Sequence, residues 1–180
     1  MRRKINLSIS VPLEGALLKK INQLLTNLYK KYNIKFIRNK NCRPHINLFS
    51  GETTHCSKIK KILNYNKKKF KKIKLVTNGV GVFLSNKPTI YLRFKSNKLL
   101  YKIRNLLFKN KKYWKKIDDS VQIDQWIAKT TLVHKDLNLN SFSSVSKYIL
   151  KKNIVEKMYS KELIFLDFTK SEEEIDHIKL

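Results

Sequence analysis

Alternation of apolar and polar residues near the start of the chain predicts a half-buried strand. Residues 5–11 read INLSISV, so every second side chain is aliphatic, which is the period of a strand with one face in the core. From Pro12 to about Tyr32 the leucines recur every three or four residues, which is the period of an amphipathic helix. The chain is therefore predicted to begin with a strand and a helix.

Both periods recur along the rest of the chain. We expect further strands at 34–38, 44–50, 73–84, 89–94 and 126–134, a last strand that ends near 168, and helices at 54–65, 96–108 and 141–152. Ser96 is a suitable N-cap for the helix that it begins. Each half of this order contains a short motif strand followed by a helix. This internal duplication in outline predicts two similar halves that face each other across a cleft.

Two of the predicted strands carry a similar motif. The stretches RPHINL and WIAKTTL contain His45 and Lys129, each followed two residues later by a hydrogen-bonding side chain, Asn47 and Thr131. Side chains alternate along a strand, so each pair should lie on one face. Together the two strands could flank a single phosphodiester.

Charge is the strongest compositional signal. The 180 residues include 40 Lys and Arg against 13 Asp and Glu, which gives a formal net charge of +27. Such a charge favours polyanionic partners, so RNA, an oligonucleotide or a cyclic nucleotide is the expected ligand. The alternative is codon composition, because most of the basic residues are Lys and the chain is also rich in Asn and Ile.

The motif pair and the element order resemble the 2H phosphoesterase superfamily, the LigT-like or 2′-5′ RNA ligase-like proteins. Members carry two H-x-[ST]-x motifs at a similar separation, often written PHITL, and GVGVFLSNKPTIYLRF resembles the strand pair between them. The resemblance covers nearly the whole chain. It implies a single domain over 1–180 with a bilobal α+β fold, in which two pseudo-symmetric halves of antiparallel sheet with flanking helices enclose a central cleft. It also implies metal-independent chemistry on 2′-5′ or cyclic phosphodiesters or on RNA 3′ ends.

The resemblance assigns roles to the motif residues. One histidine acts as general base and the other as general acid, which puts His45 and Lys129 at the catalytic places and Asn47 and Thr131 at the phosphate-binding places. The amide of Asn47 can still donate a hydrogen bond to phosphate. Lys129 is the serious departure, because an ordinary lysine has a pKa of about 10.4 and exchanges no protons near neutrality. Without a strongly lowered pKa, Lys129 would act as an electrostatic clamp on the phosphate.

Two functions remain open on these grounds. One is a slow or degenerate phosphodiesterase of the 2H type, for which intact His45 and Thr131 argue. The other is a catalytically inactive 2H domain that serves as an RNA-binding or ribonucleoprotein assembly component, for which Lys129 and the charge argue. A third interpretation is a basic α+β protein whose motif arose by chance. The sequence leaves any protein partner unidentified.

Two basic runs, NKKKFKKIK at 66–74 and KNKKYWKK at 109–116, combine lysines with aromatic residues. Interleaved charge and aromatic rings are typical of surfaces that hold phosphates and stack bases. The alternative is that both runs are solvated loops or helix ends. The candidate nucleic-acid contacts are Arg43, Lys68, Lys69, Lys71, Lys112 and Trp114, with Phe70 and Tyr113 as further stacking candidates.

Cysteine content predicts a reducing compartment without a disulfide framework. The four residues Cys42, His45, His55 and Cys56 could supply zinc ligands, but their spacing matches no common finger, so neither a metal nor a cofactor is expected. We expect an intracellular, cytoplasmic protein without a membrane partner, because the sequence has no signal-peptide pattern and no apolar run of about 20 residues. The cytoplasm of an organelle or host cell also fits.

The remaining histidines and aromatic residues are weaker candidates. His134 is five residues beyond Lys129, on the opposite face of a regular strand, and would need a β-bulge to reach the cleft. His55 could lie at the cleft rim, and His177 belongs to the acidic segment SEEEIDHIKL, which has no evident chemistry. Phe49 is expected in the core, and Trp126 either in the core or against a base.

Overall fold

Two antiparallel sheets form the molecule. The computed structural model describes residues 3–122 and 126–180. Its strands are β1 (Ile5–Pro12), β2 (His45–Thr53), β3 (Ile73–Phe83), β4 (Thr89–Phe94), β5 (Lys116–Ile117), β6 (Lys129–Val133), β7 (Lys157–Ser160), β8 (Glu162–Asp167) and β9 (Glu173–Lys179), and its helices are α1 (Gly15–Tyr32), α2 (Cys56–Asn66), α3 (Lys98–Lys109) and α4 (Leu139–Lys151). The first sheet has the order β5-β2-β1-β8-β9 and the second the order β6-β4-β3-β7. The predicted bilobal α+β architecture is confirmed.

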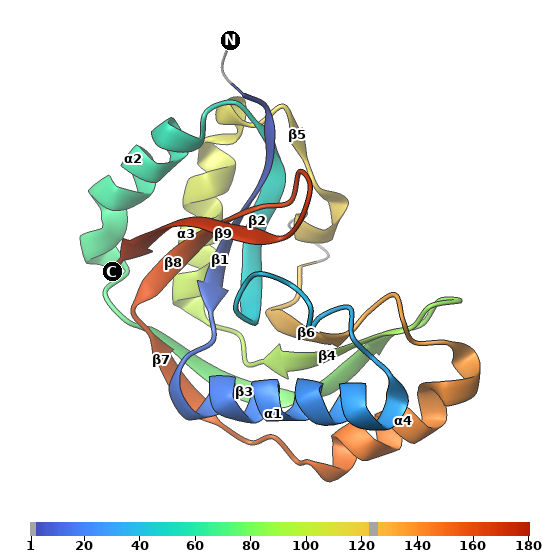
Figure 1. The fold of residues 1–180 in the computed structure, drawn as a ribbon. Helices are drawn as coiled ribbons and strands as arrows, with labels where there is room; N and C mark the ends of the chain where they lie inside the picture. The colour runs from blue at the N-terminus through green and yellow to red at the C-terminus, as the bar shows by residue number, and fades with distance from the viewer. Residues whose placement is uncertain (1–2, 123–125) are drawn as a thin grey trace.

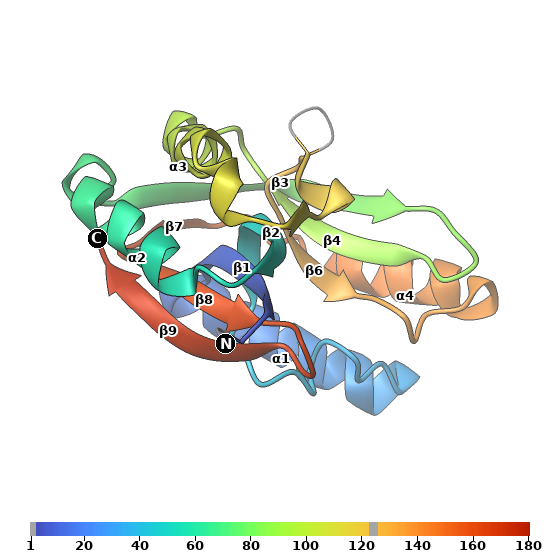
Figure 2. The same cartoon turned by 90° about the horizontal axis from the view of Figure 1, so that it is seen from above.

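Each sheet is covered by two helices. Helix α1 contacts β7 and α4, and Figure 1 shows α1 and α4 together along the second sheet. Helix α3 contacts β2 and helix α2 contacts β9, so these two helices cover the first sheet, as the view in Figure 2 also shows. One motif strand lies in each sheet, β2 in the first and β6 in the second.

The first helix joins the two lobes. Strand β1 belongs to the first sheet, α1 packs on the second, and the chain then returns to the first sheet as β2. The apolar stripe predicted for this helix is buried and consists of Leu17, Ile21, Leu24, Leu25 and Leu28. Helix α1 is capped after Tyr32 by Asn33, whose left-handed backbone (φ 55°) lets its N–H donate to carbonyls of the last turn. The segment between α1 and β2 therefore crosses the boundary between the sheets.

The strand predicted at 34–38 is wrong, because these residues form a turn in the segment between α1 and β2. The backbone N–H groups of Lys35 and Phe36 both donate to Oδ2 of Asp136, at 2.6 and 2.7 Å. A carboxylate from the loop after β6 thus satisfies two donors that a sheet partner would otherwise satisfy. The result is a turn that carries the following residues toward β6.

The predicted N-cap of α3 is also wrong, and strands β7 and β9 were not predicted. Asn97, and not Ser96, is the N-cap of α3, because its side chain accepts a hydrogen bond from the N–H of Leu99. The predicted last strand is present as β8, and β7, which precedes it and belongs to the other sheet, was not predicted. The acidic C-terminal segment, for which no element was predicted, contributes β9, which pairs with β8.

The core is continuous between the sheets and their helices. Phe49 is fully buried as predicted, and Trp126 is 8% exposed. Arg104 is buried among them: its guanidinium donates to the carbonyls of Leu48 and Val121 and lies 4.2 Å from the Trp126 ring. Among residues 3–122 and 126–180, no helix combines the length and apolarity needed to cross a membrane.

Candidate functional site

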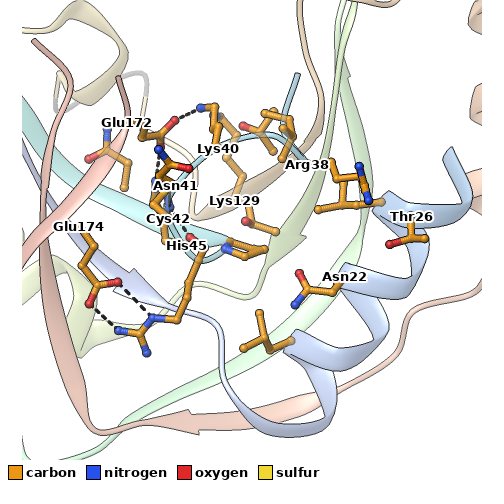
Figure 3. A pocket seen from close by; sticks show the side chains of 18 residues that line it. Asn22, Thr26, Arg38, Lys40, Asn41, Cys42, His45, Lys129, Glu172 and Glu174 are labelled. Atoms are coloured by element: carbon orange, nitrogen blue, oxygen red, sulfur yellow. Dashed lines mark hydrogen bonds and ion pairs between the residues drawn. The ribbon is translucent and has the colours of Figure 1, made fainter. Parts of the chain in front are cut away.

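His45 and Lys129 line the same cavity between the two lobes, which confirms that the motif strands face one cleft (Figure 3). The cavity has a volume of about 540 Å³. Asn47 and Thr131, the second residues of the two motifs, also line it. A volume of this size is in the range of small-molecule sites. The two-residue period of the strands therefore brings all four motif side chains together.

The ring of His45 has a fixed orientation. Its Nδ1 donates to the backbone carbonyl of Arg43 at 2.8 Å, which leaves the lone pair on Nε2 in the neutral ring. Burial, with smaller contributions from the ammonium groups of Lys40 and Lys129, lowers the pKa of His45 to about 4, although the hydrogen bond to the Arg43 carbonyl acts in the opposite direction. At neutral pH the imidazole is therefore an unprotonated acceptor that presents Nε2 to the cavity.

A carboxylate lies against this nitrogen. Oε1 of Glu172 is 3.2 Å from Nε2 of His45, and Oε2 of Glu172 forms an ion pair with Lys40. The side chain of Glu172 is only 6% exposed. A carboxylate at this distance favours the imidazolium and so opposes the lowered pKa of His45. Because Lys40 already compensates the carboxylate, burial has the larger effect and the imidazole remains neutral near pH 7.

Lys129 is partly buried beside two aromatic rings. Its Nζ lies 5.5 Å from the ring centroid of Phe83 and 5.7 Å from that of Tyr91. Burial lowers the pKa of Lys129, which is the direction that proton transfer would need. The two rings have the opposite effect, because the face of an aromatic ring attracts the charged ammonium. Burial and the two rings thus act on the pKa of Lys129 in opposite directions.

The amide of Asn47 is held in place on the first motif strand. Its Oδ1 accepts from Ser8 Oγ at 3.0 Å and its Nδ2 donates to Ser50 Oγ at 3.1 Å. The backbone carbonyl of Asn47 accepts from Nε1 of Trp126 at 2.8 Å. An amide nitrogen carries two hydrogens, so one remains for a ligand. Trp126 precedes Lys129 by three residues, and its hydrogen bond ties the two motif strands together.

The predicted contacts outside the motifs require corrections. Arg43 lines the cavity, but its guanidinium is engaged by Glu162 and Glu174, so its charge is already compensated. Trp114 is 7% exposed and packs 4.8 Å from Phe49, which removes it as a stacking surface. Phe70 is likewise buried in the core.

The four lysines predicted as nucleic-acid contacts are exposed but lie outside this cavity. Lys68, Lys69 and Lys71 flank or follow the end of α2, and Lys112 follows α3. None of these four contributes to the cavity lining around His45. Any nucleic-acid contact that they make is therefore outside the pocket.

The other histidines do not complete the motif pair. Nδ1 of His134 forms a hydrogen bond with the hydroxyl of Thr89 at 2.8 Å, and the ring packs against Phe36. His55 precedes α2 and contacts Tyr113, and His177 is an exposed residue of β9. None of the three lines the cavity.

Sequence reasoning missed several residues of the cavity. Lys40 enters it from the segment between α1 and β2, and Glu172 from the segment before β9. Asn22 and Thr26 also line it and lie on one face of α1 (Figure 3). Their spacing of four residues was a usable signal, because it predicts a polar patch on an otherwise apolar side.

Three possible metal ligands meet in this region. Cys42, His45 and Glu172 each offer one ligand atom, and these atoms lie within 4.8 Å of one another. Burial raises the pKa of the Cys42 thiol to about 11, so the thiol is protonated near neutrality. The ammonium of Lys40 already occupies the Glu172 carboxylate. A divalent cation would have to displace these charges, so the site as it stands fits an anion better.

The chain resembles known proteins in its structure but matches none of them by sequence. No family model and no curated protein sequence matches the chain. Among solved structures, E. coli LigT complexed with 3′-AMP has a TM-score of 0.58 at 12% identity, covering 99% of each chain. A protein described as a phosphoesterase has a TM-score of 0.55 at 11% identity over 98% of each chain. Kluyveromyces marxianus Usb1 has a TM-score of 0.50 at 12% identity over 99% of each chain. The chain therefore has the fold of E. coli LigT.

Proposed function

We propose that the chain binds nucleotide phosphodiesters, 2′-5′-linked or cyclic, in the cavity between its lobes and hydrolyses them slowly. The observation that carries this proposal is the convergence of His45 and Lys129, from different sheets, on one cavity. The E. coli LigT structure with 3′-AMP supports a nucleotide as the ligand of this fold.

The residues have distinct roles in this proposal. Lys129 and the free amide hydrogen of Asn47 bind the non-bridging phosphate oxygens, with Thr131 as a further hydrogen-bond donor. His45 is the proton acceptor, because its Nε2 carries a lone pair and faces the cavity. Lys40 adds positive charge beside the same nitrogen. Phosphate is thus held by cations and donors on both motif strands.

The reaction is hydrolysis of a phosphodiester to a phosphomonoester. Water attacks phosphorus, Nε2 of His45 takes a proton from that water, and the bond from phosphorus to the ribose oxygen breaks. The ribose oxygen leaves with a proton from solvent, since Lys129 serves mainly as a phosphate ligand. Loss of one general acid typically costs on the order of 10² to 10⁴ in rate. Turnover should accordingly be low.

A second candidate is an RNA-binding or ribonucleoprotein assembly component without catalytic activity. The lysine at the second motif place and the net charge of +27 favour it. It predicts nucleotide binding in the cavity with no product.

The two candidates are separated by one experiment. The full chain is incubated with 2′-5′ oligoadenylate, 2′,3′-cyclic nucleotides, cyclic dinucleotides and RNA of defined 3′ ends, and products are resolved by chromatography. We expect slow hydrolysis of at least one substrate that is lost in His45→Ala. Unchanged turnover in His45→Ala would refute the assigned role, and binding without product in the wild type would favour the assembly component.

A further inference from the structure

We propose that Glu172 is a specificity-determining residue that disfavours a phosphomonoester dianion relative to a phosphodiester monoanion in this cavity. This inference rests on the proposed function, because it concerns the ligand of the same cavity. In the reaction above it would favour the substrate and weaken binding of the product.

The position of Glu172 carries the argument. Nδ1 of His45 is engaged by the Arg43 carbonyl, so only Nε2 can meet a substrate. Glu172 Oε1 is already 3.2 Å from that nitrogen. A phosphodiester whose reacting group approaches Nε2 must therefore bring its phosphate close to the Glu172 carboxylate.

The carboxylate is held in place there. Its Oε2 pairs with Lys40, and the side chain is 6% exposed. Glu172 directly precedes β9, which pairs with β8 along its length. Burial on one side and an ion pair on the other restrict its movement when a ligand enters. The carboxylate is thus a fixed part of the cavity wall.

Charge repulsion then depends on the ligand. Two unit charges about 4 Å apart repel by about 1 kcal/mol even at the dielectric constant of water, and by more in a partly buried site. A phosphomonoester carries up to one more negative charge than a diester at neutral pH. The extra charge therefore meets a penalty of at least about fivefold in affinity. Lys40 and Lys129 attract both ligands, and Glu172 reduces the advantage of the dianion.

A matched pair of probes isolates this single charge. The probes are adenosine 3′-monophosphate and its methyl ester, which share the nucleoside and differ at one phosphate oxygen. Calorimetric titration of the full chain at about pH 8, where the monoester is a dianion, gives the ratio of their dissociation constants. Chromatography after each titration confirms that the ester is intact. The variants are Glu172→Gln and the control Glu173→Gln, which removes one charge from the adjacent, exposed residue.

We expect Glu172→Gln to shift the ratio of the two dissociation constants toward the monoester by at least about fivefold. Glu173→Gln should leave the ratio unchanged. The inference is overturned if Glu172→Gln keeps the wild-type ratio, or if Glu173→Gln shifts it equally. Should Glu172→Gln fail to fold, Glu172→Ala is titrated against the same criterion.

The proposed function can fail separately. If the wild type binds neither probe, the cavity is not a nucleotide site and the inference falls with it. If both probes bind and the ratio of their dissociation constants is the same in the wild type and in Glu172→Gln, the proposed phosphate binding stands and only the charge discrimination is wrong.

Discussion

Burial of His45 should make the stability of the fold depend on pH, and His45→Gln should remove that dependence. Burial lowers the pKa of His45 to about 4 in the folded chain, whereas an exposed histidine titrates at about 6.5. As pH falls through this window the unfolded chain takes up a proton that the folded chain does not. The contribution of His45 to stability is thus complete above about pH 6.5 and is lost as pH falls toward about 4.

The magnitude follows from the two pKa values. Between about pH 7 and about pH 5 the linkage amounts to roughly 2 kcal/mol, and below about pH 4 it reaches about 3 kcal/mol. The Glu172 carboxylate, 3.2 Å from Nε2, favours the imidazolium in the folded chain. These figures are therefore upper limits.

Urea unfolding at both pH values measures the effect. The wild type should lose roughly 2 kcal/mol more than His45→Gln between about pH 7 and about pH 5. The contribution of the carboxylates to the pH dependence cancels in the difference between the wild type and His45→Gln, because they titrate in both proteins. His177→Gln, at an exposed position on β9, should behave like the wild type. Equal pH dependence in the wild type and His45→Gln would refute the reasoning.

Three further predictions concern the motif strands and the charge. Lys129→Ala should weaken nucleotide binding more than it changes the pH profile of turnover. Lys129→His should raise turnover, because it restores a second titratable group. Loss of activity in both variants would instead identify Lys129 as a general acid. Trp126→Phe should lower the free energy of unfolding by about 1 kcal/mol in urea titrations, because Asn47 loses a hydrogen bond to its carbonyl; an unchanged value would mean that the bond contributes nothing. The logarithm of RNA affinity should fall linearly with the logarithm of the salt concentration. If affinity did not change with salt concentration, codon composition would be the better explanation of the high lysine content.

The motif strands were predictable because they depend on local period. His45 and Asn47, and likewise Lys129 and Thr131, reach one cavity because alternate side chains of a strand share a face. The apolar stripe of α1 followed from the helical period for the same reason.

The residues that sequence reasoning missed depend on contacts distant in the chain. Asp136, about 100 residues later in the chain, accepts hydrogen bonds from the backbone of residues 34–38, which therefore form a turn in place of a strand. Glu172 reaches His45 because β9 pairs with β8, and the acidic composition of that segment carried no signal of pairing. Trp114 and Phe70 lie among lysines in the sequence, but their neighbours in space are apolar. Composition alone could not separate buried from exposed aromatic residues in these runs.

Amide NMR spectra of the full chain titrated with 2′,3′-cyclic AMP test the central claim most directly, that a phosphodiester binds between the two motif strands. The account predicts that the largest shifts occur together on β2 near His45 and on β6 near Lys129, because both line the cavity. Shifts confined to the exposed lysines outside the cavity, with both motif strands unchanged, would contradict it.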